Sequence, residues 1–350
     1  MAEVRFRPGG LLWLKLPIMA EQAFVSFDLC GAGLTVAAPR RVWTDHFVRV
    51  LSRFETENAV VDAFHCVIRE DASPTPPDGI PMTWEGDFLE RRAGRLYETE
   101  AIEVVEVVGH GHVAIKHAEA AAEASMKPGS EAAFSFTPLM CVLDAALRSA
   151  GRVLIHAACL ALPDRSGAIV VCAPSGFGKT TTSLALARGG FGLVSDDASI
   201  VEPRSEGPFV WGLPRRLKVH HQTVAMMPWI GEFPDTWNDE GEQAIDTATL
   251  RDLISISDPV PVPLKAVVVL GSRSDSGHRF ALLSKAEALI RIAQDNVSNS
   301  STGVKVWNRR QFDAYAELLR STPVLQLNAG TEVDSLPAEL MTALGQLVPD

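Results

Sequence analysis

Residues Val170 to Thr181 read VVCAPSGFGKTT, and this stretch decides the expected fold. An apolar run predicts a buried strand, a glycine-containing loop follows, and the residues from Thr181 onward favour a helix. Strand, loop and helix in that order form a phosphate-binding loop, in which backbone N–H groups and the helix N-terminus surround an anion. The residues expected to contact a nucleotide are Ala173, Pro174, Ser175, Gly176, Phe177, Gly178, Lys179, Thr180 and Thr181.

Two side chains of this loop have specific chemistry. Lys179 is expected to neutralise phosphate charge and to take part in catalysis, and the Thr180 hydroxyl is expected to hold Mg²⁺. Ala173 stands where the usual pattern has glycine, and alanine is small enough to permit close backbone approach. The alternative is a glycine turn that binds nothing, which the Gly-Lys-Thr between a strand and a helix disfavours. We therefore expect ATP or another nucleoside triphosphate as the ligand.

A pair of acidic residues is the second signal. An apolar strand from Phe191 to Val194 leads into Ser195-Asp196-Asp197. A phosphate-loop enzyme needs a carboxylate near its threonine-bound Mg²⁺, and a neighbouring strand end can supply it. Asp196 and Asp197 are thus predicted metal ligands, and Asp197 is the predicted base for an attacking hydroxyl. The alternative is that both merely end a strand at a turn.

His156 is a third candidate, within the apolar stretch Val153–Leu162, which is a predicted strand. Residues Pro163 to Gly167 join this stretch to the strand before the loop and are short enough for a hairpin. Whether the register brings His156 near the glycine loop stays open. A lone histidine in an apolar run is most often a hydrogen-bonded core residue.

Together, His156, the phosphate loop and the Ser195-Asp196-Asp197 stretch resemble the catalytic core of HPr kinase/phosphorylase and its relatives, which share a fold with phosphoenolpyruvate carboxykinase. The motifs cover roughly residues 150 to 200. The resemblance implies metal binding and base activity for the aspartates and contact of His156 with the transferred phosphate. It implies an ATP- and Mg²⁺-dependent kinase acting on a serine of a small protein or peptide. Relatives beside peptide natural-product machinery make a precursor peptide one candidate acceptor.

Cations gather after this core, in the stretch WGLPRRLK at residues 211–218. Arg215, Arg216 and Lys218 are candidate catalytic residues, because phosphoryl transfer needs positive charge around the transferred group. A solvated basic turn is an equal alternative. The glutamate and arginine signature of true HPr kinases is missing here, which leaves the HPr substrate and the reverse phosphorylase reaction in question.

The expected fold class is α/β, with a kinase domain at residues 131–350 and a smaller α+β domain at residues 1–130 that recognises substrate or supports assembly. The 350-residue chain is 47% apolar and has a net charge of −11, which argues against nucleic-acid binding. Scattered cysteines suggest buried thiols in the cytoplasm, and no stretch predicts a membrane span or a signal peptide. The resemblance suggests a homo-oligomer.

Two other functions remain open from the sequence. A nucleotide-binding regulatory module would keep the phosphate loop and turn over little. A small-molecule kinase or carboxykinase-type enzyme would act on a metabolite. The sequence fixes neither the acceptor nor a preference for ATP over GTP.

Overall fold

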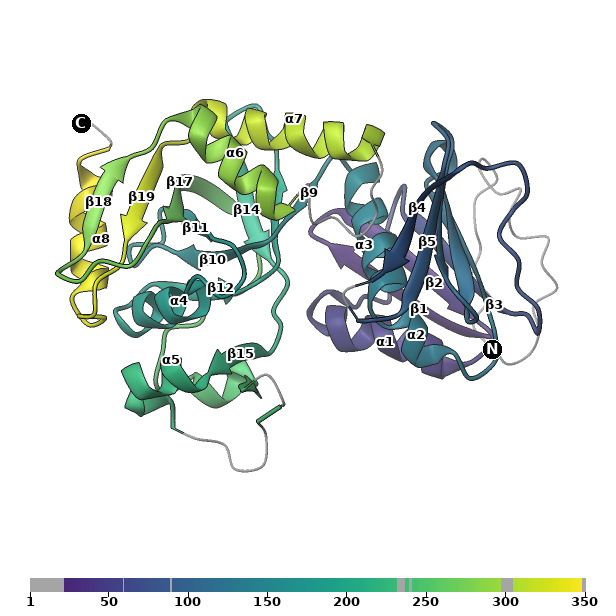
Figure 1. Ribbon diagram of the computed structural model, residues 1–350, viewed down its shortest axis with the longest axis horizontal. Coiled ribbons are helices and arrows are strands. Elements are labelled where there is room, and N and C mark those ends of the chain that lie inside the picture. The colour runs from purple at the N-terminus through teal and green to yellow at the C-terminus, as the bar shows by residue number, and fades with distance from the viewer. Residues whose placement is uncertain are drawn as a thin grey trace.

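The computed structural model describes residues 22–58, 60–88, 90–231, 237–238, 241–296 and 305–347. In this part of the chain, two lobes stand side by side, each built on its own β-sheet (Figure 1). Both sheets combine parallel and antiparallel pairs, so the protein is a mixed α/β protein.

The N-terminal lobe has an eight-stranded sheet in the described residues, in the order β1-β2-β3-β8-β7-β6-β5-β4. Strand β3 is parallel to both of its neighbours, and the other pairs are antiparallel. The elements of this lobe are β1 (Ala23–Leu29), β2 (Ala32–Ala38), α1 (Arg41–Leu51), the 3₁₀ turn η1 (Ser52–Phe54), β3 (Phe64–Glu70), β4 (Met82–Asp87), β5 (Ala93–Glu98), β6 (Ile102–Val107), β7 (Gly111–Lys116), η2 (His117–Glu119), β8 (Ala121–Met126), α2 (Glu131–Phe134) and α3 (Thr137–Ser149).

Aromatic rings hold the helices of this lobe together. Phe134 packs edge-on against Trp43 and contacts Phe47, with ring centroids 5.8 Å apart in both pairs. The same buried cluster continues into the second lobe through Trp211 and Leu213. This buried cluster therefore spans both lobes and packs them against each other.

The predicted domain boundary near residue 130 stays a prediction. Helix α3 follows that point in the sequence, yet it packs against β2, β3 and β7 of the first sheet as well as β9 of the second. Its apolar residues are buried on almost every side, as in a helix enclosed between two layers.

The C-terminal lobe has a nine-stranded sheet in the described residues. Strands β11, β17 and β19 lie parallel, whereas β10 and β12 run antiparallel beside β11. The elements are β9 (Val153–Ile155), β10 (Ala157–Ala161), β11 (Ala168–Cys172), α4 (Lys179–Arg188), β12 (Gly192–Ser195), β13 (Ser199–Glu202), β14 (Phe209–Gly212), β15 (Leu217–His220), α5 (His221–Met226), η3 (Pro228–Ile230), β16 (Glu242–Ile245), η4 (Thr247–Leu250), β17 (Val262–Leu270), β18 (Arg279–Leu282), α6 (Lys285–Asn296), α7 (Lys305–Ser321), β19 (Val324–Asn328) and α8 (Leu336–Gly345).

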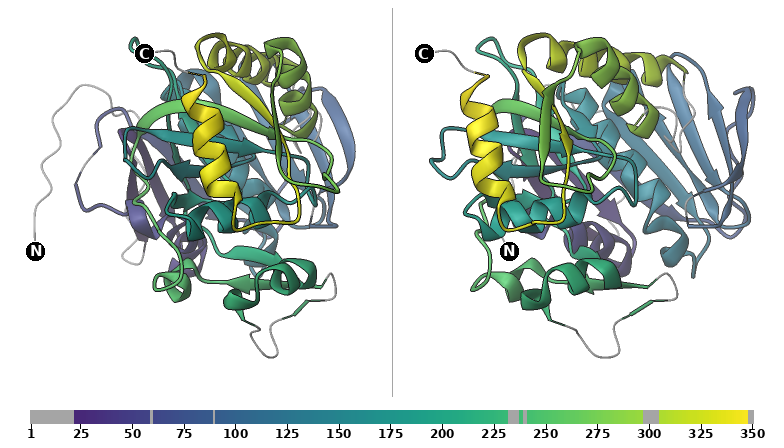
Figure 2. Two further views of the ribbon diagram at one scale, coloured as in Figure 1. Left: turned by 90° about the vertical axis from the view of Figure 1, so that its left-hand side faces the viewer. Right: turned by 60° about the vertical axis from the view of Figure 1, so that its left-hand side comes forward.

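Helices cover both faces of this sheet (Figure 2). Helices α4 and α8 pack on one face, where Leu184 and Leu340 belong to one buried cluster. Helices α6 and α7 pack on the other face through residues that include Ile292 and Leu318. Strands β15 and β16 form a separate two-stranded sheet beside α5. No helix in the described ranges is both long and apolar enough to span a bilayer.

The predicted hairpin between the His156 stretch and the loop strand is confirmed, and its register settles the open question about His156. Ala157 of β10 pairs with Cys172 of β11. The next position back along β10 is His156, and the next position forward along β11 is Ala173, where the glycine loop begins. His156 also marks a break, because β9 before it pairs with β13 and β10 after it pairs with β11 and β12. The single predicted strand Val153–Leu162 is therefore two strands with a bend at the histidine.

Candidate active site

The glycine loop joins the end of β11 to the start of α4, in the predicted order of strand, loop and helix. Gly176 has φ +80° and Gly178 has φ +94°. These values lie in the left-handed region, which costs free energy for residues with a Cβ, so glycine suits both positions. The loop then delivers Lys179 to the first position of α4, with only 7% of its surface exposed.

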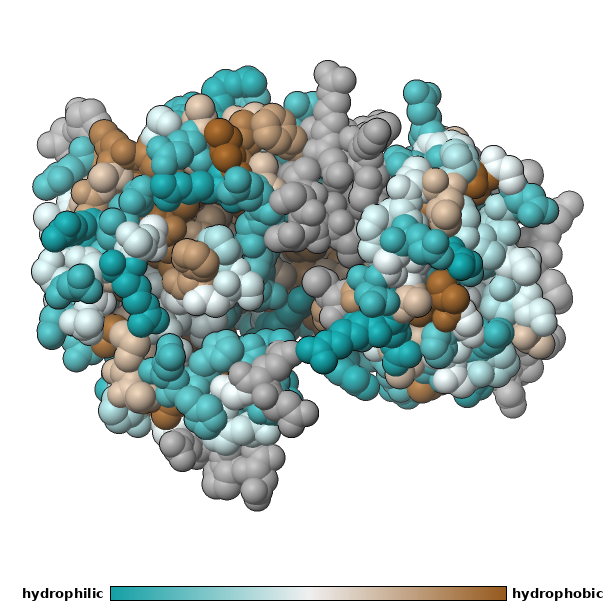
Figure 3. Space-filling model, in the orientation of Figure 1, coloured by the Kyte–Doolittle hydropathy of each residue, from teal (hydrophilic) through white to brown (hydrophobic). Residues whose placement is uncertain are grey.

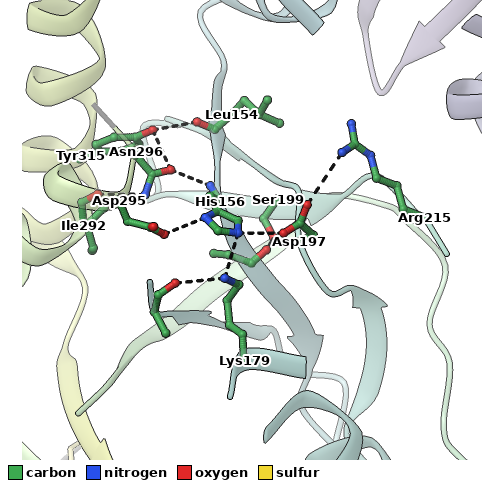
Figure 4. A network of polar contacts seen from close by, with 12 residues as sticks. Leu154, His156, Lys179, Asp197, Ser199, Arg215, Ile292, Asp295, Asn296 and Tyr315 are labelled. Carbon is green, nitrogen blue, oxygen red and sulfur yellow. Dashed lines mark hydrogen bonds and ion pairs between the residues drawn. The ribbon is translucent and has the colours of Figure 1, made fainter. Parts of the chain in front are cut away.

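The Lys179 ammonium contacts His156, which lies at the centre of the polar network (Figure 4). Its Nζ donates to the carbonyl oxygen of Ala173 at 3.0 Å and lies 2.9 Å from Nε2 of His156. These contacts include no carboxylate. An ammonium in this environment is suited to an anionic ligand such as a phosphate.

Thr180 and Asp196, the first predicted metal pair, are brought into direct contact. The Thr180 hydroxyl donates to Oδ2 of Asp196 at 2.6 Å. The second oxygen, Oδ1, is buried and has no hydrogen-bond partner among the residues that the structure describes. Burial raises the pKa of Asp196 to about 6, although the Thr180 hydrogen bond opposes this shift.

These two residues fit the expected Mg²⁺. A buried, unpartnered carboxylate oxygen beside a threonine hydroxyl supplies the hard oxygen ligands that this ion prefers. No group of three or more His, Cys, Asp or Glu side chains in the described ranges could hold a metal ion. Mg²⁺ needs no such group, since it is usually bound by one or two carboxylates together with substrate phosphates and water.

His156 connects the two acidic parts of the site. Its Nε2 lies 2.8 Å from Oδ1 of Asp197, and its Nδ1 lies 2.8 Å from Oδ2 of Asp295. Burial and the charge of the neighbouring Lys179 ammonium would lower the pKa of His156, but the two carboxylates outweigh both effects and raise the pKa to about 9. The imidazole is therefore protonated at neutral pH and forms ion pairs with both carboxylates.

Asp197 is ionised because positively charged groups surround it. Burial would raise its pKa, but the His156 hydrogen bond and the charges of His156, Lys179 and Arg215 outweigh burial and lower the pKa to about 2. Its two oxygens face His156 and Arg215, and the closest Arg215 contact is 3.9 Å. The predicted role of Asp197 as a second metal ligand stays a prediction.

Sequence reasoning missed three residues that hold His156 in place. Besides Asp295, the Asn296 side-chain oxygen accepts from the His156 backbone N–H at 2.6 Å, and the Tyr315 hydroxyl donates to the Leu154 carbonyl at 2.8 Å. One signal was present, because Asp295 lies in the last turn of α6, where the helix dipole disfavours an acid. An acid at that position suggests a specific cationic partner.

The three basic residues that follow β14, which are Arg215, Arg216 and Lys218, do not all reach the site. Arg215 reaches the site, and its Nη2 donates to the Met140 sulfur at 2.9 Å. The Arg216 guanidinium donates to the Ala244 carbonyl, and the Lys218 ammonium lies 3.4 Å from Glu242. These contacts direct Arg216 and Lys218 toward β16 rather than toward Asp197.

Two cavities flank Phe177, whose side chain is exposed on the glycine loop. One, of about 220 Å³, lies between the loop, the end of β17 and the last residues of α6. The other, of about 60 Å³, lies at Thr181 and Thr182, against the ends of β17 and β19. In parallel α/β sheets, ligands bind beyond the carboxyl ends of the strands.

The stretch Pro228–Gly241 has weak periodicity and is predicted to be a long loop or lid, whose aromatic residues could cover a nucleotide, grip a peptide or pack against the domain. Its two tryptophans pack against the lobe itself. Trp237 stacks on His221 with ring centroids 3.5 Å apart, and Arg188 lies over the Trp229 ring. Phe233 and Pro234 of the same stretch lie outside the described residues.

Comparison with known proteins gives limited information. No family model matches the chain, and no curated protein matches it. A solved structure of the Hpr(Ser) kinase/phosphatase from Coxiella burnetii is similar over 37% of this chain and 72% of that chain, with 15% identity and a TM-score of 0.25. A similarity at this level is distant and establishes neither a shared activity nor a shared substrate.

Proposed function

We propose that this protein is a Mg²⁺-dependent kinase that transfers the γ-phosphate of ATP to a serine hydroxyl of a small protein or peptide. The observation that carries the proposal is the convergence of the glycine loop and the paired aspartates. Thr180 of the loop donates to Asp196, and Lys179 and Asp197 contact the same nitrogen of His156. A phosphate loop beside two carboxylates and a histidine has the parts that phosphoryl transfer requires.

In this proposal, loop backbone N–H groups and Lys179 bind the β- and γ-phosphates. Thr180 and Asp196 would hold Mg²⁺, which supplies positive charge to the phosphates when bound. The adenine ring would lie in the cavity at Thr181 and Thr182, beyond the parallel ends of β17 and β19. The γ-phosphate would then face Asp197.

The proposed chemical step uses Asp197 to orient the acceptor hydroxyl. The hydroxyl oxygen forms a bond to the γ-phosphorus, the bond from that phosphorus to the bridging oxygen of ADP breaks, and the hydroxyl proton passes to Asp197. A carboxylate with a low pKa is a weak base, but phosphoryl transfer depends mainly on positioning and electrostatic stabilisation. Protonated His156 would contact the transferred group and stabilise its charge.

The experiment is mass-spectrometric detection of phosphoserine in a peptide library incubated with the full chain, ATP and Mg²⁺. We expect phosphorylated peptides with the wild type. In Asp197→Asn we expect a loss of about 100-fold or more in kcat, with ATP affinity within a few fold. Unimpaired Asp197→Asn would remove this residue from the base role. ATP binding without transfer would favour the regulatory module, and transfer to a metabolite alone would favour a small-molecule kinase.

A further inference from the structure

Arg215 lies on the far side of Asp197 from Lys179 (Figure 4). One Asp197 oxygen faces His156 at 2.8 Å, and the other faces Nη1 of Arg215 at 3.9 Å. In the proposed reaction, the phosphates lie on the side of Asp197 that faces the glycine loop and Lys179. Arg215 is therefore placed where the acceptor, rather than the nucleotide, approaches the carboxylate.

The Arg215 guanidinium has weak partners for a largely buried cation. Within the described ranges, its polar contacts are a thioether sulfur, which is a weak acceptor, and a carboxylate beyond hydrogen-bond distance. Its side chain is 29% exposed, and burial lowers its pKa. A planar cation with five donors and few acceptors is suited to bind an anionic group from outside the chain.

This guanidinium also stands at the junction of the two lobes. Met140, which contacts it, belongs to α3 of the N-terminal lobe, and Phe136 at the head of that helix is 46% exposed. The surface is hollowed between the lobes (Figure 3). A peptide that reaches Asp197 from this junction would pass Arg215 as it presents a hydroxyl.

We propose that Arg215 binds the carboxylate of an acidic residue next to the acceptor serine. The proposal rests on the proposed kinase function. Nη1 of Arg215 lies only 3.9 Å from the Asp197 carboxylate. A hydroxyl held by Asp197 and a carboxylate held by Arg215 would therefore lie close enough together to belong to neighbouring residues of one peptide.

The test uses the full chain with ATP, Mg²⁺ and serine peptides that differ only in Glu or Gln beside the serine. We expect the wild type to prefer the Glu peptide by about tenfold or more in kcat/KM, mainly through KM. Arg215→Gln should abolish the preference while ATP affinity stays within about twofold, and Arg215→Glu should prefer a Lys peptide. Arg204→Gln is the matched control, because Arg204 pairs with Glu202 and stacks on Phe209, and it should keep the wild-type preference.

Each other outcome overturns the inference. A wild type that treats the Glu and Gln peptides alike, or an Arg215→Gln enzyme that still prefers Glu, removes the carboxylate contact. A large loss of ATP affinity in Arg215→Gln assigns the guanidinium to the nucleotide phosphates instead. Failure of the wild type to phosphorylate any peptide overturns the proposed function and this inference with it, whereas transfer without acidic preference overturns this inference alone. ATP binding and circular dichroism show that each variant is folded.

Discussion

The Nδ1 atom of His156 lies 2.8 Å from the carboxylate of Asp295, although the two residues are 139 positions apart in the sequence. Asp295 comes from the end of α6, and His156 comes from the bend between β9 and β10. This contact fixes the imidazole orientation and directs Nε2 toward Lys179 and Asp197. Asp295 acts through His156 and is therefore a positioning residue.

Asp295→Asn should lower the pKa of His156, because it removes one of the two carboxylates that raise that pKa to about 9. We expect kcat to fall by about 10- to 100-fold with ATP affinity nearly unchanged. NMR titration of the imidazole measures the pKa, and steady-state kinetics measures kcat. An unchanged His156 titration would show that Asp295 has no electrostatic role.

Tyr315→Phe should destabilise the support behind His156 without altering the chemistry of the site. The Tyr315 hydroxyl donates to the Leu154 carbonyl at 2.8 Å, and the side chain is almost fully buried. Loss of this hydrogen bond should cost about 1 kcal/mol in the free energy of unfolding. Urea denaturation measures the difference, and a variant as stable as the wild type would contradict the assigned hydrogen bond.

Ala329→Trp should fill the cavity at Thr181 and Thr182, where we expect the nucleotide base. The affinity for ATP should fall by about tenfold or more, whereas the affinity for tripolyphosphate should stay near the wild-type value. Isothermal titration calorimetry measures both ligands. Ser272→Trp in the cavity near Asp295 is the matched control, and loss of ATP affinity in that variant alone would place the base there.

Glu103 predicts a pH dependence of stability that is independent of the active site. Burial, together with the charges of Asp144 and Glu98, raises the pKa of Glu103 to about 7 against the opposing charge of Arg148. The folded protein therefore binds more protons than the unfolded chain between about pH 4.5 and 7, so this group's contribution to stability decreases as pH rises through that range.

The Glu103→Gln variant should lose the pH-dependent contribution of Glu103 to the free energy of unfolding. The free-energy difference between wild type and variant should change by on the order of 2–3 kcal/mol between pH 4.5 and 8. Chemical denaturation at several pH values measures it, and comparison with the variant cancels other titrating groups such as Asp196. A difference that stays constant with pH would show that Glu103 is ionised throughout.

The glycine loop and the hairpin before it could be predicted, because both depend on residues that are close in the sequence. The glycine loop follows from the need for positive φ at Gly176 and Gly178, and the hairpin follows from two apolar runs joined by a short turn. The bend at His156 was not predicted, because it arises when β9 and β10 pair with different strands. Asp295, Asn296 and Tyr315 come from distant helices, and a single sequence contains no signal of which helix covers which strand.

The roles of the three basic residues at positions 215–218 also could not be predicted from the sequence. Arg215, Arg216 and Lys218 are close in sequence and equal in charge, so composition cannot separate their roles. The structure directs Arg215 toward Asp197 and directs the other two toward β16.

The most direct test of the shared nucleotide and metal site is the Mg²⁺ dependence of ATP binding, measured by isothermal titration calorimetry in the wild type and in Asp196→Asn. The wild type should bind ATP at least about tenfold more tightly with Mg²⁺ than without it, and Asp196→Asn should lose most of that gain. Equal enhancement by Mg²⁺ in both proteins, or no ATP binding by the wild type, would contradict the convergence of the glycine loop and the paired aspartates on one magnesium nucleotide.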